Sequence, residues 1–195
     1  MASKLPAARK PLLAIDKTAR DAFMPYRGSA PVRALSWLSE LGDQPQMRAL
    51  AGGMLAAGVV RADGRMIRAG ARMLIAHELA TAVKNAVKHR IDRARPRSAT
   101  TKKQQQPKPG RSRGKEDTSF PSGHSAGSMA VALALAAEYP RHRSKAVATA
   151  GSVALAQMPR CAHYPTDVAA GLVLGATAER IVALAFRGLA AAFRR

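Results

Sequence analysis

Small apolar residues dominate the long uncharged stretches of this chain, and this feature most narrows the folds open to it. Hydrophobic residues make up 47% of the 195 residues, yet aromatic residues make up only 4%, so the apolar content is largely Ala, Leu and Val. These residues favour helices that pack closely and disfavour a β-sandwich or barrel. No stretch alternates apolar and polar residues with a period of two. We therefore expect an all-α fold, a bundle of five to six helices.

Proline and glycine punctuation divides the apolar part of the chain into helix candidates. Pro96, Pro140 and Pro159 each forbid simple continuation of the helix before them. The helix predicted at residues 66–88 can extend to Ala94, before Pro96 ends it. The predicted helices cover residues 31–41, 46–60, 66–88, 122–139, 145–158 and 166–187.

The chain length suits a single domain, which we place at residues 31–195. Residues 1–30 are basic and interrupted by proline, so we expect a surface-lying or loosely ordered arm. This arm lacks the long apolar segment of a signal peptide. Residues 97–118 are rich in Lys, Gln, Pro, Gly and Arg, which cannot bury a core, and we expect a mobile basic loop there.

The chain is strongly basic, with 32 Lys and Arg residues against 12 Asp and Glu residues and a formal charge of +20. Nucleic acid, an anionic membrane surface and phosphorylated substrates all fit this excess, and charge alone does not choose among them. The single cysteine, Cys161, excludes an intramolecular disulfide and any metal site built from several cysteines.

The segment Ser119–His124 (SFPSGH) precedes an apolar helix and has the properties of an anion seat. Ser122 can cap the helix, and Gly123 lets the backbone approach a ligand closely. The free N–H groups and the positive end of the helix dipole would face a phosphate, with His124 in the first turn. Taken alone, the segment also fits an ordinary Ser-Gly helix start with a surface histidine.

Two further segments carry cations and a histidine. Lys88 and Arg95 lie seven residues apart, on one helical face. There the ammonium group of Lys88 and the planar guanidinium of Arg95 can both bind phosphate oxygens. His163 precedes Asp167 by four residues at a helix start, so that the carboxylate can fix the imidazole tautomer and leave the other ring nitrogen free to attack. Taken alone, Lys88 and Arg95 also fit a solvated basic helix end, and the segment from His163 to Asp167 also fits a simple N-cap.

The order of the three segments is more informative than any one of them. The cations end one apolar helix, the anion seat begins the next, and His163 lies before the last helix. In an antiparallel bundle with short turns, all three fall at the same end. We therefore expect two cations, a helix N-terminus and two histidines around one cavity.

This pattern resembles the type 2 phosphatidic acid phosphatase superfamily, which also contains bacterial acid phosphatases and vanadium haloperoxidases. The family motifs K-x6-R-P and P-S-G-H are present in full, as Lys88 to Pro96 and Pro121 to His124. The third motif, S-R-x5-H-x3-D, is present in its second half, from His163 to Asp167. At the place of its Ser-Arg stand Ala156 and Gln157, so a phosphate-binding arginine is missing there.

The resemblance implies roles for these residues. His163 attacks phosphorus to form a phosphohistidine, Asp167 orients it, and His124 protonates the leaving oxygen and then activates water. Binding of the phosphate oxygens falls to the remaining motif residues, with Gln157 and Arg160 as candidates to replace the missing arginine. No metal and no cofactor are expected, and vanadate would be held only by a haloperoxidase-like member. The predicted phosphate-binding residues are Lys88, Arg95, Ser122 and Gly123, with Gln157 and Arg160.

The resemblance also implies a multi-pass protein of the bacterial inner membrane acting on a lipid or isoprenoid phosphate or diphosphate, with no specific nucleic-acid partner. The basic residues at the end opposite the motifs predict, by the positive-inside rule, that the site faces outward. The alternative is a basic helical protein with a weakened or inactive site that binds anionic lipid or nucleic acid. The residues at the opposite end include Arg61, Arg65, Arg141, Arg143 and Lys145.

Overall fold

The structure, a computed structural model, describes residues 9–192. Within this range the chain forms seven α-helices, two very short strands and three single-turn 3-10 helices. The α-helices are α1 (Arg9–Phe23), α2 (Ala30–Glu40), α3 (Gln44–Val60), α4 (Gly64–Lys88), α5 (Gly123–Glu138), α6 (Arg143–Leu155) and α7 (Pro165–Ala192). The remaining elements are η1 (Met24–Tyr26), β1 (Ile91–Asp92), β2 (Lys108–Pro109), η2 (Lys115–Asp117) and η3 (Pro140–His142).

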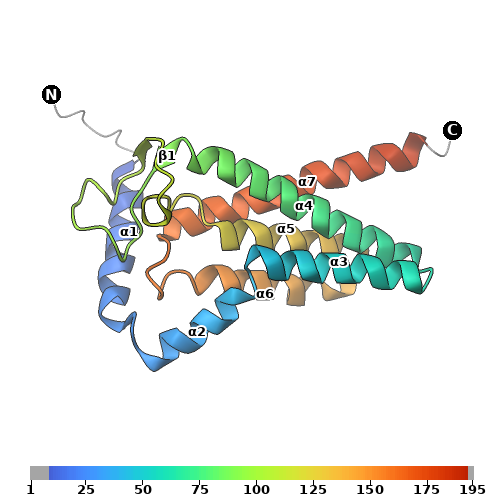
Figure 1. The fold of residues 1–195 in the computed structure, drawn as a ribbon, viewed down its shortest axis with the longest axis horizontal. Helices are drawn as coiled ribbons and strands as arrows, with labels where there is room; N and C mark the ends of the chain where they lie inside the picture. Colours follow the sequence, from blue (N-terminus) through green and yellow to red (C-terminus); the bar gives the residue numbers. More distant parts are fainter. Residues whose placement is uncertain (1–8, 193–195) are drawn as a thin grey trace.

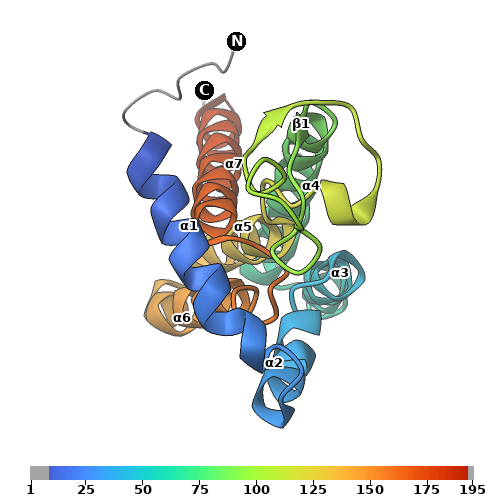
Figure 2. The same cartoon turned by 90° about the vertical axis from the view of Figure 1, so that its left-hand side faces the viewer.

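The long helices form an elongated bundle with α5 at its centre (Figure 1). Helix α5 packs against α4, α6 and α7, and α3 packs mainly on α4. At one end of the bundle, α1 lies across the helix ends, and the segment between α4 and α5 covers the rest of that end (Figure 2). The elements therefore divide into a helical body and a cap of α1 and loops at one end.

Close approach of α7 to α5 depends on two glycines of α7. A Cβ atom at Gly175 would lie 2.2 Å from the Ala126 carbonyl oxygen, and one at Gly171 would lie 2.5 Å from the Ser122 carbonyl oxygen. Any side chain at these positions would push the helices apart. The small residues of α5, of which Ala126 and Ala130 are almost fully buried, complete this tight contact.

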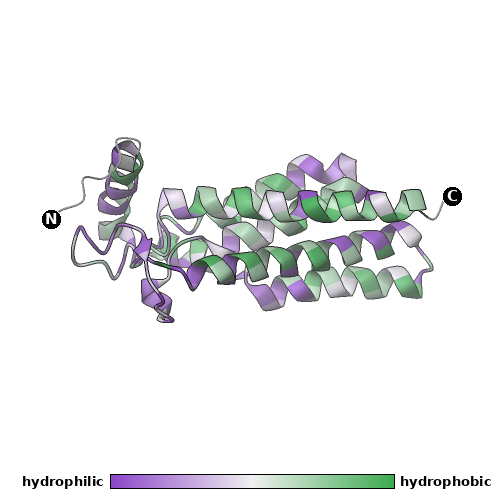
Figure 3. Ribbon diagram, turned by 90° about the horizontal axis from the view of Figure 1, so that it is seen from above, coloured by the Kyte–Doolittle hydropathy of each residue, from purple (hydrophilic) through white to green (hydrophobic). Residues whose placement is uncertain are grey.

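The outer faces of the bundle expose many large apolar side chains, and green colour follows the long helices in Figure 3. Among the helices in residues 9–192, only α7 is both long and apolar enough to cross a membrane by length and composition. Of its most apolar 18-residue segment, 39% is buried inside the bundle. Exposed apolar residues on the bundle helices include Leu50, Val60, Ile75, Leu155, Val173, Ile181 and Leu184.

The bundle buries one ion-pair network near its middle. The Arg72 guanidinium of α4 contacts Glu179 of α7 at 2.6 Å and Glu138 of α5 at 3.1 Å. All three side chains are largely withdrawn from solvent, and a buried charge needs such partners because its desolvation is costly. The network ties together three of the four longest helices.

The helices predicted within residues 31–195 are confirmed within a few residues at their ends, and the fold is helical as expected. Two features differ from the expectation. Residues 9–23 form helix α1, so the expected arm contains a seventh helix, while residues 1–8 lie outside the described range. Helix α4 ends at Lys88 and does not reach Ala94, because residues 91–92 pair with residues 108–109 as a small antiparallel ladder.

Candidate active site

The three motifs lie at the capped end of the bundle, where α4 ends and α5 and α7 begin (Figure 1). Lys88 is the last residue of α4, Ser122 is the N-cap of α5, and His163 lies two residues before α7. A hydrogen bond from the Ser122 backbone N–H to the Asp167 carbonyl oxygen, 3.0 Å long, joins the starts of α5 and α7. The up-and-down order of the helices thus brings the predicted segments together, as their order in the sequence indicates.

The start of α5 is a helix N-terminus capped by Ser122. The Ser122 hydroxyl accepts from the Ser125 backbone N–H at 3.4 Å and from the Ser125 hydroxyl at 2.8 Å. A Cβ atom at Gly123 would lie 3.0 Å from Cδ of Lys84, so glycine lets this buried lysine pass close to the helix start. Lys84 lies one helical turn before Lys88 in α4, on the same face, and its ammonium adds positive charge near the start of α5.

Lys88 and Arg95 are held by backbone carbonyl groups of the covering loops. Nζ of Lys88 donates to the Thr118 carbonyl oxygen at 2.5 Å. Arg95 donates through Nε to the Lys115 carbonyl oxygen at 2.8 Å and through Nη1 to the Ala162 carbonyl oxygen at 3.4 Å. These bonds orient both side chains through neutral carbonyl groups. Burial, with the nearby charges of Arg95 and Lys84, lowers the pKa of Lys88 to about 7, so a bound anion would favour its charged form.

His163 is 3% exposed, and its Nδ1 lies 3.8 Å from Oδ2 of Asp167. This distance is too long for a hydrogen bond, and Nδ1 has no hydrogen-bond partner. Burial lowers the pKa of His163 to about 4, with the nearby charges of Arg95 and Lys88 acting in the same direction and Asp167 opposing them. The imidazole is therefore neutral at pH 7, which is the form a nucleophile requires.

Asp167 makes its short contacts elsewhere. Its Oδ1 accepts from Arg93 at 2.6 Å, and its Oδ2 accepts from the Tyr164 backbone N–H at 2.9 Å. The side chain is fully buried, so both contacts form in a low-dielectric surrounding. The sequence predicted the approach of Asp167 to His163 but neither of these two partners.

His124 faces a different carboxylate. Its Nε2 lies 2.7 Å from Oδ1 of Asp43, the N-cap residue of α3, and its side chain is 26% exposed. Arg95 and Arg160 are close enough for their charges to act on His124, and Arg95 acts on His163 as well. The two histidines thus share Arg95 as a charged neighbour, and each has its own aspartate. Asp43 was not predicted, because it lies 81 positions before His124 in the chain.

Gln157 occupies the position of the missing family arginine and is fully buried. Its amide donates to the Ser39 hydroxyl at 2.6 Å and to the Val153 carbonyl oxygen at 3.0 Å. Arg160 donates to the same Ser39 hydroxyl and to Oε1 of Gln157 at 3.3 Å. Gln157 therefore supports Arg160, whose charge acts on His124.

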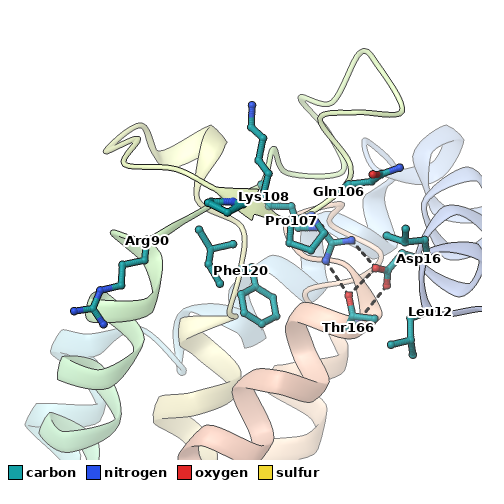
Figure 4. Close-up of a pocket in the computed structure, with 12 residues that line it drawn as sticks. Leu12, Asp16, Arg90, Gln106, Pro107, Lys108, Phe120 and Thr166 are labelled. Carbon is teal, nitrogen blue, oxygen red and sulfur yellow. Dashed lines mark hydrogen bonds and ion pairs between the residues drawn. The ribbon is translucent and has the colours of Figure 1, made fainter. Parts of the chain in front are cut away.

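The structure adds Arg93 and Asp16 to the residues around the site. Arg93 is buried and contacts Asp16 of α1 at 2.5 Å as well as Asp167. Figure 4 shows Asp16 facing Thr166 at the start of α7, with dashed lines for the contacts between them. The only hint of a role for Arg93 in the sequence was its position two residues before Arg95. Asp16 fell in the segment expected to be an arm.

A pocket of about 410 Å³ lies at this end of the bundle, beside Arg93 and Thr166 (Figure 4). Its wall is mainly apolar, with Leu12, Leu13 and Phe120 among the lining residues. Lys88, Arg95, His124 and His163 do not line it. The pocket therefore adjoins the motif cluster without containing it.

Within residues 9–192, no group of three or more His, Cys, Asp or Glu side chains is placed to hold a metal ion. The polar cluster instead combines two imidazoles, two carboxylates and several cations around a helix N-terminus. Such a set can bind a tetrahedral anion, supply a nucleophile and move a proton.

Three comparisons relate this chain to known proteins. The family model of the PAP2 superfamily matches residues 69–189. A lipid A 1-phosphatase from Rhizobium johnstonii (strain DSM 114642 / LMG 32736 / 3841) is 41% identical over 68 residues, which are 35% of this chain and only 28% of that relative. The crystal structure of a transmembrane PAP2-type phosphatidylglycerolphosphate phosphatase from Bacillus subtilis superposes with a TM-score of 0.62, over 96% of this chain and 90% of that one, at 19% identity. At this identity the likeness concerns the fold.

Proposed function

The chain belongs to the PAP2 superfamily, and on that premise we propose that it is a membrane phosphatase that hydrolyses the phosphate or diphosphate ester of a lipid. The observation that carries the proposal is the pairing of each motif histidine with a carboxylate beside a shared cation. His124 faces Asp43, His163 faces Asp167, and the charge of Arg95 acts on both imidazoles. The lipid phosphatases among the similar proteins support the substrate class.

In the first step, Nε2 of His163 attacks phosphorus while the bond from phosphorus to the leaving oxygen breaks. This oxygen is the ester oxygen of a lipid monophosphate or the bridging oxygen of a lipid diphosphate. Asp167 lies on the Nδ1 side, which leaves Nε2 as the attacking atom. His124 gives its proton to the leaving oxygen, so that the product leaves as an alcohol or, from a diphosphate, as a monophosphate. Asp43 stabilises the protonated form of His124 before this transfer.

In the second step, His124 takes a proton from water, and the water oxygen attacks the phosphohistidine. The bond between nitrogen and phosphorus breaks, and inorganic phosphate leaves. Lys88, Arg95 and the N–H groups at the start of α5 offset the charge that develops on the phosphate oxygens in both steps. Arg160 is the cation we assign to the role of the missing family arginine, because it reaches toward His124 from the loop that holds Gln157.

We place the bundle in the membrane with the motif end at the outer surface. The exposed apolar side chains along α3, α4, α6 and α7 support insertion, since the surface of a soluble protein rarely exposes so many large apolar side chains. The opposite end of the bundle carries basic residues in both of its loops, where Nε of Arg65 donates to the Glu138 carbonyl oxygen at 2.6 Å. Excess basic charge in short loops favours the cytoplasmic side.

The test is phosphate release by the detergent-purified protein in the presence of EDTA. The substrate panel contains phosphatidate, phosphatidylglycerol phosphate, undecaprenyl diphosphate and lipid A, so that it separates the candidate classes. We expect release from at least one of them, and no release by His163→Ala. His142→Ala, an exposed histidine at the opposite end of the bundle, is the matched control and should keep the full rate. Salt-dependent DNA binding without phosphate release from any substrate would favour a non-enzymatic role.

A further inference from the structure

Arg93 is one of the most completely buried side chains in the described part of the chain, with 1% of its side chain exposed. Its guanidinium lies 3.9 Å from the centre of the Tyr164 ring, measured from Cζ. Both terminal nitrogens contact carboxylates, Nη1 meeting Asp167 at 2.6 Å and Nη2 meeting Asp16 at 2.5 Å. Nη1 also donates to the Thr166 hydroxyl at 2.8 Å. Arg93 is therefore fixed in position on several sides.

Asp16 brings helix α1 into this cluster. Its side chain is 3% exposed, and besides Arg93 it accepts from the Thr166 backbone N–H at 3.0 Å and from the Thr166 hydroxyl at 2.6 Å. Thr166 is the residue directly before Asp167. A carboxylate on an outlying helix is thus bonded to the first turn of the helix that carries the catalytic aspartate (Figure 4).

We propose that Asp16 and Arg93 are positioning residues that hold the Asp167 carboxylate in the orientation from which it serves His163. The inference rests on the proposed function, since it assigns these residues to the same reaction. Arg93 occupies Oδ1 of Asp167, so the carboxylate cannot rotate, and Oδ2 stays on the side of Nδ1 of His163. A carboxylate without this anchor would choose among several rotamers, and few of them would face the imidazole.

Asp16 has an electrostatic part in this arrangement. Arg93 carries one positive charge between two carboxylates, so the cluster of Asp16, Arg93 and Asp167 has one net negative charge beside His163. Without Asp16, the charge of Arg93 would be balanced by Asp167 alone. Asp167 would then stabilise the imidazolium-like charge of the transition state less well. The loss should appear in kcat more than in KM, because the phosphate-binding residues are untouched.

The test is a double-mutant cycle of Asp16→Asn and Arg93→Gln, measured as kcat and KM for the best substrate of the panel. A misplaced catalytic group costs up to roughly 100-fold in rate, and we expect each single variant to lose 10- to 100-fold in kcat with KM changed less than threefold. The double variant should lose no more than Arg93→Gln alone, because Asp16 acts through Arg93. Lys17→Gln is the matched control on α1, since Lys17 forms an exposed ion pair with Asp21, and it should keep the wild-type kcat.

Asp16→Asn or Arg93→Gln leaves a buried charge with one partner fewer, which can prevent folding. Thr166→Val is the variant that tests the proposal in that case. It removes the hydroxyl that accepts from Arg93 and donates to Asp16, but it leaves every charge paired. We expect it to fold with a Tm close to that of the wild type and to lose several-fold in kcat at unchanged KM. Wild-type kcat in a folded Thr166→Val or Asp16→Asn protein would overturn the proposal. So would losses that multiply in the double variant. If His163→Ala is inactive in the same assay, the proposed function stands whichever way this result falls.

Discussion

A single methyl group at Gly171 should disturb both the stability of the bundle and the position of the phosphate seat. Gly171 lies in α7 where this helix crosses the start of α5. A Cβ atom there would lie 2.5 Å from the Ser122 carbonyl oxygen and 2.9 Å from Cβ of Ser125. Both contacts are far shorter than van der Waals separation, and one is with backbone, so Gly171→Ala forces the two helix starts apart.

The expected size of the effect follows from two opposing contributions. Replacing glycine by alanine within a helix stabilises by about 0.5–1 kcal/mol when the methyl group meets nothing. Forcing an extra methylene into a packed contact costs about 1–3 kcal/mol. The net destabilisation of Gly171→Ala is then between about 0 and 2.5 kcal/mol. For a chain of this size, 1 kcal/mol corresponds to about 2–4 °C, so Tm should fall by up to about 10 °C.

Gly151→Ala is the matched control, because Gly151 lies in α6 and a Cβ atom there would meet no atom within 4 Å. Thermal unfolding in detergent should show a lower Tm for Gly171→Ala and a Tm raised by about 1–4 °C for Gly151→Ala. At a temperature where both variants are folded, kcat should fall only in Gly171→Ala, because Ser122 belongs to the proposed anion seat, Ser119–His124. A Tm for Gly171→Ala that rises as in the control would refute the close contact between α5 and α7.

Three further predictions concern charge. Arg160→Gln should lower kcat/KM about tenfold to a hundredfold, the value of one charge-assisted contact of about 1.5–3 kcal/mol, whereas Arg61→Gln at the opposite end should have no effect in the same phosphate-release assay. The acidic limb of the pH profile of kcat/KM should lie near pH 4, because the pKa of His163 is lowered to about 4 and the neutral nucleophile persists down to that pH; a limb near 6.5 would contradict the burial of this imidazole. Arg72→Ala should destabilise by about 3–5 kcal/mol, since it leaves the buried Glu179 carboxylate without its partner and Glu138 with Arg68 alone, and a Tm within 2 °C of the wild type would show that the network contributes little.

Much of the fold could be predicted from the sequence because the apolar stretches are long and end at proline or glycine. Each such stretch between Pro31 and Arg187 became a helix, with ends shifted by a few residues. Helix α1 was missed because proline and charged residues interrupt the apolar residues of its sequence, RKPLLAIDKTARDAF. Its apolar residues do recur on one helical face, and this period was the signal that could have identified it.

The candidate site divides in the same way. Lys88, Arg95, His124 and His163 belong to motifs whose order along the chain predicts a shared end of the bundle. Their partners do not belong to local motifs, because contacts such as that of Arg93 with Asp16 join residues 77 positions apart. Such pairs are set by how loops and α1 fold over the helix ends, which sequence spacing does not specify.

The gap between His163 and Asp167 shows where spacing alone was insufficient. A spacing of four residues at a helix start predicted a direct hydrogen bond, but the atoms lie 3.8 Å apart, and the short contacts of Asp167 are with Arg93 and the Tyr164 backbone N–H. Gln157 is a second case. It was expected as a substitute phosphate ligand, and it instead bonds Ser39 and Val153.

The central claim is that His163 carries the phosphoryl group during turnover. The most direct measurement is rapid quenching of the enzyme with a substrate labelled at the transferred phosphate, under alkaline conditions, followed by peptide mapping of the labelled protein. We expect label bound to nitrogen in the peptide that contains His163, and its loss in His163→Ala. Label on another residue, or rapid hydrolysis of the substrate by His163→Ala, would contradict the claim.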